Sequence, residues 1–318
     1  GDILMNMDSG TEGELYVGCA GGVDTIGTWV PTFEAVPEGM TAFRLFVKGL
    51  KGGHSGMDIN LGRANANKVI IRFVHDLKDL NYELASIQGG NLRNAIAREA
   101  EAVFIVDETA KHEVVTRFNT YKAQVEEQFK NVENDMILSL ESCTLPPAII
   151  PTEQAHRLID ALQACPHGMI AMSKEIKGLV ETSTNLASIK MKDGFVEINT
   201  SQRSSVESEK HRIKNQVEQT LAAACDEVTH GDGYPGWAPN TRSELLKVTK
   251  QAYEDLYGQE PAILAIHAGL ECGLFLEKYP YLDMVSIGPQ MYGVHSPQER
   301  LSISSTARCW TWLKRVLE

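Results

Sequence analysis

Short apolar segments at the two ends of this sequence constrain its fold more than any other feature. Near the N-terminus, DILMNMD (residues 2–8) and ELYVGCA (14–20) predict two short β-strands around a polar turn. A single seven-residue strand is not stable by itself, so these strands need neighbours from elsewhere in the chain. After residue 240, helix and strand patterns alternate, which is typical of a parallel α/β layer. We therefore expect the first strands to join this later layer.

The residues between the two ends follow another pattern, which predicts an antiparallel sheet backed by helices. The expected elements are a hairpin-like pair of strands within 27–50, helices near 60–79, 108–128, 152–163 and 206–226, and strands near 82–90, 101–106, 135–142, 185–191 and 195–204. Glycine pairs and the Gly/Pro-rich THGDGYPGWAPN (229–240) mark the two boundaries. The predicted division is an α/β domain in two segments, 1–23 and 233–318, interrupted by an α+β domain at 24–232.

Composition and charge exclude several classes of protein. The chain has 318 residues, 43% of them apolar and 23% charged, which is ordinary for a globular protein of about two domains. Its formal net charge of -12 provides no basic surface for nucleic acid or anionic lipid. Six scattered cysteines without a C-x-x-C pair suit reduced thiols. No apolar run approaches the roughly 18 residues that span a bilayer, and no signal peptide is recognisable, so we expect a soluble, cytoplasmic protein.

Two candidate metal ligands follow predicted strands of the split layer. Asp8 ends DILMNM, and His295 follows DMVSIGPQMYGV. Ligands gather at the carboxyl ends of strands in open α/β sheets, and a carboxylate with an imidazole suits zinc. Zinc needs three or four protein ligands, however, and these are two. Asp8 is equally well explained as a turn or capping acid, and His295 as an exposed histidine before a Ser-Pro turn.

Three further residues are candidates for substrate binding or catalysis. His54 lies in the glycine-rich GGHSG, which is also the composition of a solvated turn. Arg203 ends a predicted strand, where it can grip a carboxylate with two parallel hydrogen bonds or simply pair with a helix acid. Gly269, in AIHAGLECG, connects a strand to a helix whose free backbone N–H groups can receive an anion. Phosphate-binding loops and nucleophile elbows are absent from the sequence.

As a set, six stretches of the sequence resemble the lidded di-zinc exopeptidases, and within them the aminoacyl-histidine (Xaa-His) dipeptidase family. They occur in the family's order from the first residue to the last, and this ordered similarity is more specific than any single stretch. The stretches are NMDSGTEGELYVGCAGG, VKGLKGGHSGMDINLGRANANK, GGNLRNAIARE, ETSTNLASIKMKDGFVEINTSQRSS, AIHAGLECGLF and SIGPQMYGVHSPQER.

The resemblance implies a catalytic α/β domain interrupted by a lid domain through which two chains can form a homodimer. The implied reaction is hydrolysis of dipeptides, in particular carnosine-like Xaa-His dipeptides, by a water that two zinc ions activate. Asp8 and His295 match metal ligands of the family. His54 matches a lid histidine that is offered to the active site of the neighbouring subunit, where it polarises the scissile carbonyl. Arg203 matches the arginine that holds the substrate's C-terminal carboxylate, with Asn94 and Gly269 as supporting contacts.

The sequence also departs from the family pattern. The H-x-D motif, the metal-bridging aspartate and the Glu-Glu pair that precede the position of Asp8 in the family have no counterpart here. We therefore expect a C-terminal fragment, inactive alone, whose partner would be the upstream half of the catalytic domain. Two alternatives stay open at this point. One is a non-catalytic dimerisation or ligand-binding module, and the other is another lidded hydrolase, such as an acylase or a broad-specificity dipeptidase.

Overall fold

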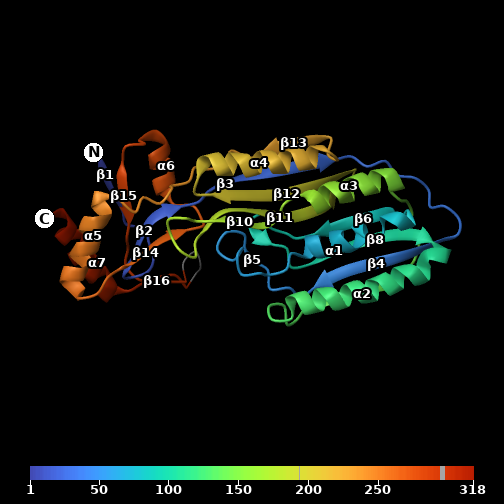
Figure 1. The fold of residues 1–318 in the computed structure, drawn as a ribbon, viewed down its shortest axis with the longest axis horizontal. Coiled ribbons are helices and arrows are strands. Elements are labelled where there is room, and N and C mark those ends of the chain that lie inside the picture. The colour runs from blue at the N-terminus through green and yellow to red at the C-terminus, as the bar shows by residue number, and fades with distance from the viewer. Residues whose placement is uncertain (193, 294–297) are drawn as a thin grey trace.

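The computed structural model describes residues 1–192, 194–293 and 298–318. They form two main β-sheets, each with its own helices, which follow one another along the long axis of the molecule (Figure 1). Both chain termini lie beside the smaller sheet, and most of the intervening residues belong to the larger one. The fold class predicted from the sequence, an α/β layer interrupted by an α+β unit with an antiparallel sheet, is confirmed.

The smaller sheet joins the two ends of the chain. Its strand order is β1 (Ile3–Asn6), β15 (Asp283–Ser286), β2 (Glu14–Cys19) and β14 (Ala262–Ile266). Strand β1 runs parallel to β15, and β14 runs parallel to β2. The two pairs meet in antiparallel orientation, where Ser286 is opposite Tyr16, so the layer is mixed rather than purely parallel.

Three helices accompany the smaller sheet: α5 (Glu244–Tyr257), α6 (Glu271–Lys278) and α7 (Ile303–Leu317). Helix α5 begins at Ser243, whose side chain accepts a hydrogen bond from the Leu246 N–H, and it ends at Gly258 in the left-handed conformation. The rings of Tyr253 and Trp312 meet edge to face 4.6 Å apart and pack α5 against α7. Burial of these rings with strand residues gives the smaller sheet a hydrophobic core of its own.

The larger sheet has nine strands, and every pair in it is antiparallel. Its order is β13 (Glu227–His230), β3 (Gly21–Trp29), β12 (Phe195–Ser204), β11 (Val180–Lys192), β6 (Glu83–Gly89), β8 (Ala100–Asp107), β4 (Met40–Lys48) and β9 (Ile137–Cys143), with β10 (Gly168–Met172) paired to β11.

The hairpin expected within 27–50 is wrong. Strand β3 pairs with β12 and β13, whereas β4 pairs with β8 and β9 at the far side of the sheet. The connection between them contains Pro31 and Pro37, which cannot donate backbone hydrogen bonds and therefore do not continue a ladder. The two strands are neighbours in sequence only.

Four helices cover one face of the larger sheet (Figure 1). They are α1 (Ala66–His75), α2 (Lys111–Phe129), α3 (Thr152–Ala164) and α4 (Glu207–Ala222). Their apolar sides bury residues such as Ile70, Phe73, Leu158 and Val217 against the inward-facing strand residues, in the largest hydrophobic cluster of the molecule. None of the helices formed by the described residues has the length and apolar character that crossing a bilayer requires.

Several short elements complete the structure. They are the strand pairs β5 (Gly53–His54) with β7 (Ala95–Ile96) and β16 (Met291–Tyr292) with β17 (Arg300–Leu301), and the 3₁₀ turns η1 (Lys78–Leu80) and η2 (Glu108–Ala110). The chain passes directly from β2 into β3, and isolated bridges from Cys19 to Trp237 and from Gly22 to Tyr234 hold the returning segment beside it. This junction positions the candidate site.

Candidate functional site

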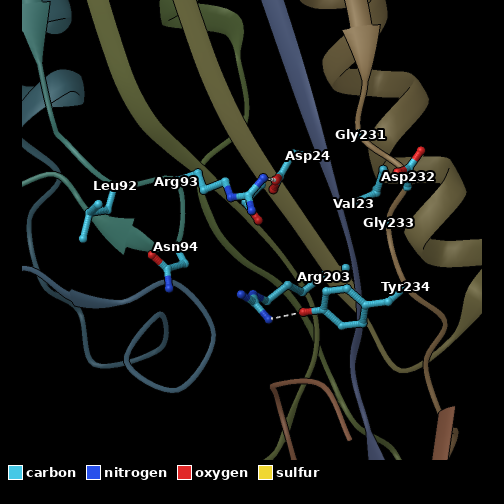
Figure 2. Close-up of a pocket in the computed structure, with 12 residues that line it drawn as sticks. Val23, Asp24, Leu92, Arg93, Asn94, Arg203, Gly231, Asp232, Gly233 and Tyr234 are labelled. Atoms are coloured by element: carbon cyan, nitrogen blue, oxygen red, sulfur yellow. Dashed lines mark hydrogen bonds and ion pairs between the residues drawn. The ribbon is translucent and has the colours of Figure 1, made fainter. Parts of the chain in front are cut away.

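Arg203 is the central residue of the candidate site. It lies near the end of β12, opposite Gly22 of β3 on one side and Ser183 of β11 on the other. Its side chain is 7% exposed. Nη1 donates a hydrogen bond to Tyr234 Oη at 2.6 Å, and Nε has no partner among the described residues (Figure 2).

A buried guanidinium in this situation favours an anionic ligand. Burying a charge is costly unless the charge is paired and its hydrogen bonds are satisfied. The neighbour that Arg203 has, Tyr234, is a neutral phenol, because burial raises the pKa of Tyr234 more than the nearby Arg203 lowers it. The positive charge is therefore not cancelled by this contact. A carboxylate that accepts two hydrogen bonds from the guanidinium would supply what the site lacks.

Two glycines allow Tyr234 to lie where it does. A Cβ atom on Gly22 would be 2.7 Å from the Tyr234 ring, and one on Gly269 would be 2.8 Å from it. Both distances are too short for a side chain to fit without displacement of the ring. Gly269, a predicted anion-binding position, thus has an observed role as a packing site beneath Tyr234.

His54 lies in a turn that fixes its tautomer. Its Nδ1 atom accepts hydrogen bonds from the backbone N–H groups of Gly56 and Met57, both at 3.1 Å. An acceptor at Nδ1 carries no proton, so in the neutral ring the proton is on Nε2. Burial and, secondarily, the charge of Arg203 lower the pKa of His54, whereas Asp58 raises it. His54 is therefore a neutral ring with one N–H group to donate.

A second histidine, His267, belongs to the same cluster. It follows β14, is 5% exposed, and its Nε2 atom lies 2.7 Å from Ser183 Oγ. Burial lowers the pKa of His267 to about 3, with Arg203 as the next cause. The turn of His54 packs directly on it, since a Cβ on Gly56 would be 2.1 Å from the His267 carbonyl oxygen.

Sequence analysis did not single out His267, although the stretch AIHAGLECG contains it. The available signal was its position at the carboxyl end of a strand, where ligands gather in α/β sheets. What identifies it in the structure is burial beside Arg203, and burial of one particular histidine cannot be read from a local pattern.

Asn94 reaches the site from the loop between β6 and β7. Its carbonyl oxygen accepts a hydrogen bond from Ser55 N at 2.9 Å, and β5 pairs with β7 so that His54 is opposite Ala95. The loop of Asn94 and the turn of His54 are therefore held side by side.

Asn94 and Arg203 both line a cavity of about 610 Å³ (Figure 2). The wall of this cavity is formed by residues 22–24 of β3, the loop residues 92–94, Ser201 and Arg203 of β12, and residues 231–234. Backbone from four separate parts of the chain thus surrounds a space with Arg203 at its side.

The candidate metal ligands do not form a site among the described residues. Asp8 follows β1 and is exposed, with its backbone N–H bonded to Asn6 Oδ1 at 2.9 Å. His295 lies outside the residues that the structure describes. Among those that are described, no group of three or more His, Cys, Asp or Glu side chains can hold an ion. A zinc site needs three or four protein ligands, so the described donor set does not fit zinc.

The structure thus brings His54, Asn94, Arg203 and Gly269 into one region, together with Tyr234 and His267. No hydrogen bond or ion pair among the described residues joins Asp8 to this group. The prediction that His54 acts on a neighbouring subunit is not tested by a single chain, in which the turn of His54 packs on His267 of the same chain.

The chain is similar to known proteins over all or part of its length. The family described as the M20 peptidase dimerisation domain matches residues 47–133. Over 318 residues the chain is 40% identical to a cytosol non-specific dipeptidase of Escherichia coli (strain K12), and it spans 66% of that relative. The crystal structure of an aminoacylhistidine dipeptidase from Vibrio alginolyticus matches the whole chain with a TM-score of 0.95 and 39% identity, and the chain covers 65% of it.

The two-sheet architecture and the dimerisation-domain match define a peptidase fold of the M20 type. Both relatives match the full length of this chain in sequence, and the Vibrio alginolyticus protein also matches it in structure, whereas the chain spans just under two thirds of each relative. The chain is therefore similar over its whole length to two dipeptidases.

Proposed function

We propose that this chain serves the metal-dependent hydrolysis of dipeptides and that Arg203 binds the C-terminal carboxylate of the substrate. The observation that carries the proposal is the state of Arg203: 7% exposed, bonded to a neutral phenol, and without a partner at Nε among the described residues. A carboxylate is the anion that every dipeptide presents at its C-terminus. Recognition of that group restricts the site to the last residue of a peptide, as an exopeptidase requires.

His54 has the properties of a donor to the scissile carbonyl oxygen. Its Nε2–H group is free of the two backbone contacts that hold Nδ1. A fixed neutral donor stabilises the charge that develops on this oxygen in the transition state more than it stabilises the ground state. We assign this role to His54, whether the substrate that it contacts is bound by its own chain or by a neighbouring subunit.

Asn94 and His267 support this arrangement in different ways. Asn94 lines the cavity and can donate a side-chain hydrogen bond to the carboxylate that Arg203 holds. His267 stays uncharged at neutral pH, so it packs beside Arg203 without adding a second positive charge. Of Arg203 and His267, only Arg203 is therefore charged at neutral pH.

The metal part of the proposal rests on the family. M20 peptidases imply a divalent ion, and we propose two zinc ions with Asp8 and His295 among their ligands. Zinc supplies a water that is ionised near neutral pH. Because the described residues do not form a complete metal site, we derive no catalytic step through the ion.

We also propose substrates, an assembly and a cellular location for the protein from its similarity to known proteins. The name of the Vibrio alginolyticus relative supports Xaa-His dipeptides, including carnosine-like ones, as substrates, and the name of the Escherichia coli relative supports a cytoplasmic protein with broader specificity. The match at 47–133 supports a homodimer formed through a lid domain, which we place at 24–232 between catalytic segments 1–23 and 233–318.

The test measures hydrolysis and binding separately. The protein is incubated with Ala-His and Ala-Ala, with added zinc or with a chelator, and released amino acids are quantified; calorimetry measures binding of the same dipeptides. We expect binding that requires the free carboxylate, and zinc-dependent release of both amino acids where the ligand set of the metal is complete. Binding without release in zinc would favour a ligand-binding module. Absence of both would contradict the proposal.

A further inference from the structure

A second charged region faces the same cavity as Arg203. Asp24 of β3 is opposite Ser201 of β12, two residues from the position where Gly22 is opposite Arg203. Alternate residues of a strand face the same side of the sheet, so Asp24 and Arg203 share one face. Diagonal neighbours of this kind lie roughly 7–8 Å apart in an antiparallel pair. Figure 2 shows that Asp24 and Arg203 occupy different positions on the wall of the same cavity.

Asp24 is paired with an arginine that can leave it. Arg93 Nη1 lies 3.0 Å from Asp24 Oδ2, and the side chains of Arg93 and Asp24 are 74% and 22% exposed. Arg93 belongs to the loop between β6 and β7, whereas Asp24 lies within strand β3, where it is paired with Ser201 of β12. An exposed ion pair contributes little free energy, because solvent competes for both partners. The pair can therefore be exchanged for a ligand at little cost.

The balance of charge in the cavity favours a ligand group that donates hydrogen bonds. Besides Arg203, the charged residues that line it are Asp24, Asp232 and Arg93. Once a carboxylate has neutralised Arg203, the charged residues left in the cavity lining are Asp24, Asp232 and the exposed Arg93. An acidic side chain would be repelled there, and a cationic one would be attracted.

We propose that Asp24 binds the side chain of the substrate's C-terminal residue and favours imidazole, ammonium and guanidinium groups, with Arg93 as the counter-ion that is displaced. The inference rests on the proposed function, because Arg203 fixes the carboxylate of that same residue. An independent observation indicates that a ligand binds in this cavity. Arg203 lines the cavity and is 7% exposed, yet its Nε atom has no partner among the described residues. When a smaller side chain is bound, Arg93 remains paired with Asp24.

The kinetic test uses substrate pairs and two opposite substitutions. The ratio of kcat/KM for Ala-Lys to that for Ala-Ala is measured for the unmodified protein, Asp24→Asn and Arg93→Ala. We expect Asp24→Asn to lower this ratio roughly tenfold, the lower end of the loss of a hydrogen bond to a charged group. Arg93→Ala removes the competing counter-ion and should raise the ratio about twofold to fivefold. General damage to the fold would not move the ratio in opposite directions.

A matched pair elsewhere provides the control. Asp255 and Arg315 form an exposed ion pair between α5 and α7 at 3.6 Å, away from the cavity lining. Asp255→Asn and Arg315→Ala should leave the ratio unchanged. An unchanged ratio in Asp24→Asn, with Ala-Ala still hydrolysed, would overturn this inference and leave the proposed function intact.

Binding of free amino acids tests the role of Asp24 separately from the proposed hydrolysis of dipeptides. Calorimetry with L-histidine, L-lysine and L-alanine needs no hydrolysis, so it can be carried out even if neither dipeptide is cleaved. We expect L-lysine and L-histidine to bind more tightly than L-alanine, and Asp24→Asn to abolish that difference. A preference for L-glutamate would also overturn the inference, because it would assign the pocket to Arg93 rather than to Asp24.

Discussion

Arg203 Nη1 donates a 2.6 Å hydrogen bond to the phenol oxygen of Tyr234, so a buried cation is bonded to a neutral group where a carboxylate would ordinarily be expected. The phenol aligns the guanidinium without cancelling its charge. Tyr234 is in turn held against Gly22 and Gly269, neither of which could carry a side chain in this packing. The pair keeps Arg203 oriented and available for an anionic ligand.

Tyr234→Phe tests this relationship. Removal of the hydroxyl leaves the ring packing intact and takes away the hydrogen bond that orients Arg203, so KM for dipeptides should rise about tenfold while kcat changes less. Tyr257→Phe is the control, because its hydroxyl bonds the Arg308 carbonyl between α5 and α7. Equal KM values in Tyr234→Phe and the unmodified protein would show that the hydrogen bond does not position Arg203.

His54→Ala should lower kcat by about 100-fold to 1,000-fold with a smaller effect on KM, since an oxyanion donor acts mainly in the transition state. The lowered pKa of His54 keeps it neutral above pH 6.5, and protonation at Nδ1 would break its contacts with Gly56 and Met57. Protonation of His54 should therefore lower kcat only on the acid side of the pH-rate profile. His112→Ala, on the exposed surface of α2, is the control. A kcat equal to that of the control would remove His54 from catalysis.

His267 should make the fold sensitive to acid. Its pKa is about 3 in the folded chain and about 6.5 when unfolded, so between these values the unfolded chain binds a proton that the folded chain does not. The free energy of unfolding therefore falls as pH decreases, by about 2 kcal/mol for this group between pH 7.5 and 5. Urea unfolding should show that His267→Gln loses less stability over this range. His167, whose pKa is about 4, leaves part of the sensitivity in place. Identical losses would mean that His267 titrates normally.

Gly56→Ala should disturb the turn that carries His54. The new Cβ would lie 2.1 Å from the His267 carbonyl oxygen and 3.2 Å from the His54 ring, and the first contact is with backbone that cannot rotate away. We expect a loss of about 1–3 kcal/mol in stability and a lower kcat. Thermal unfolding and steady-state kinetics measure the two effects. Normal values for both would show that the turn and His267 separate easily.

Much of the fold was predictable from the sequence because the chain's periodic segments are long. The helices α2, α3 and α4 were expected within a few residues of their observed bounds, and β1 was correctly expected to join the C-terminal layer. The hairpin error has a physical cause: neighbouring strands usually pair, and no local pattern states that the chain crosses the sheet between β3 and β4.

The site was predictable in part and for a different reason. His54, Arg203 and Gly269 were candidates from their local sequence and gained specific roles through the ordered similarity of the surrounding stretches, whereas Asn94 was found through that similarity alone. His267, Tyr234 and Asp24 were missed because their importance depends on burial and on strand register, for example Asp24 opposite Ser201. Such relationships join residues far apart in sequence and appear only when the chain is folded.

The most direct test of the central claim compares a dipeptide with its C-terminal amide in the unmodified protein and in Arg203→Lys. Lysine keeps the charge but cannot make the two parallel hydrogen bonds of a guanidinium. We predict that Arg203→Lys lowers kcat/KM for the free acid by roughly tenfold or more and leaves the value for the amide within about twofold. An equal loss on both substrates would contradict the account, because Arg203 would then be a structural residue and not the one that binds the carboxylate.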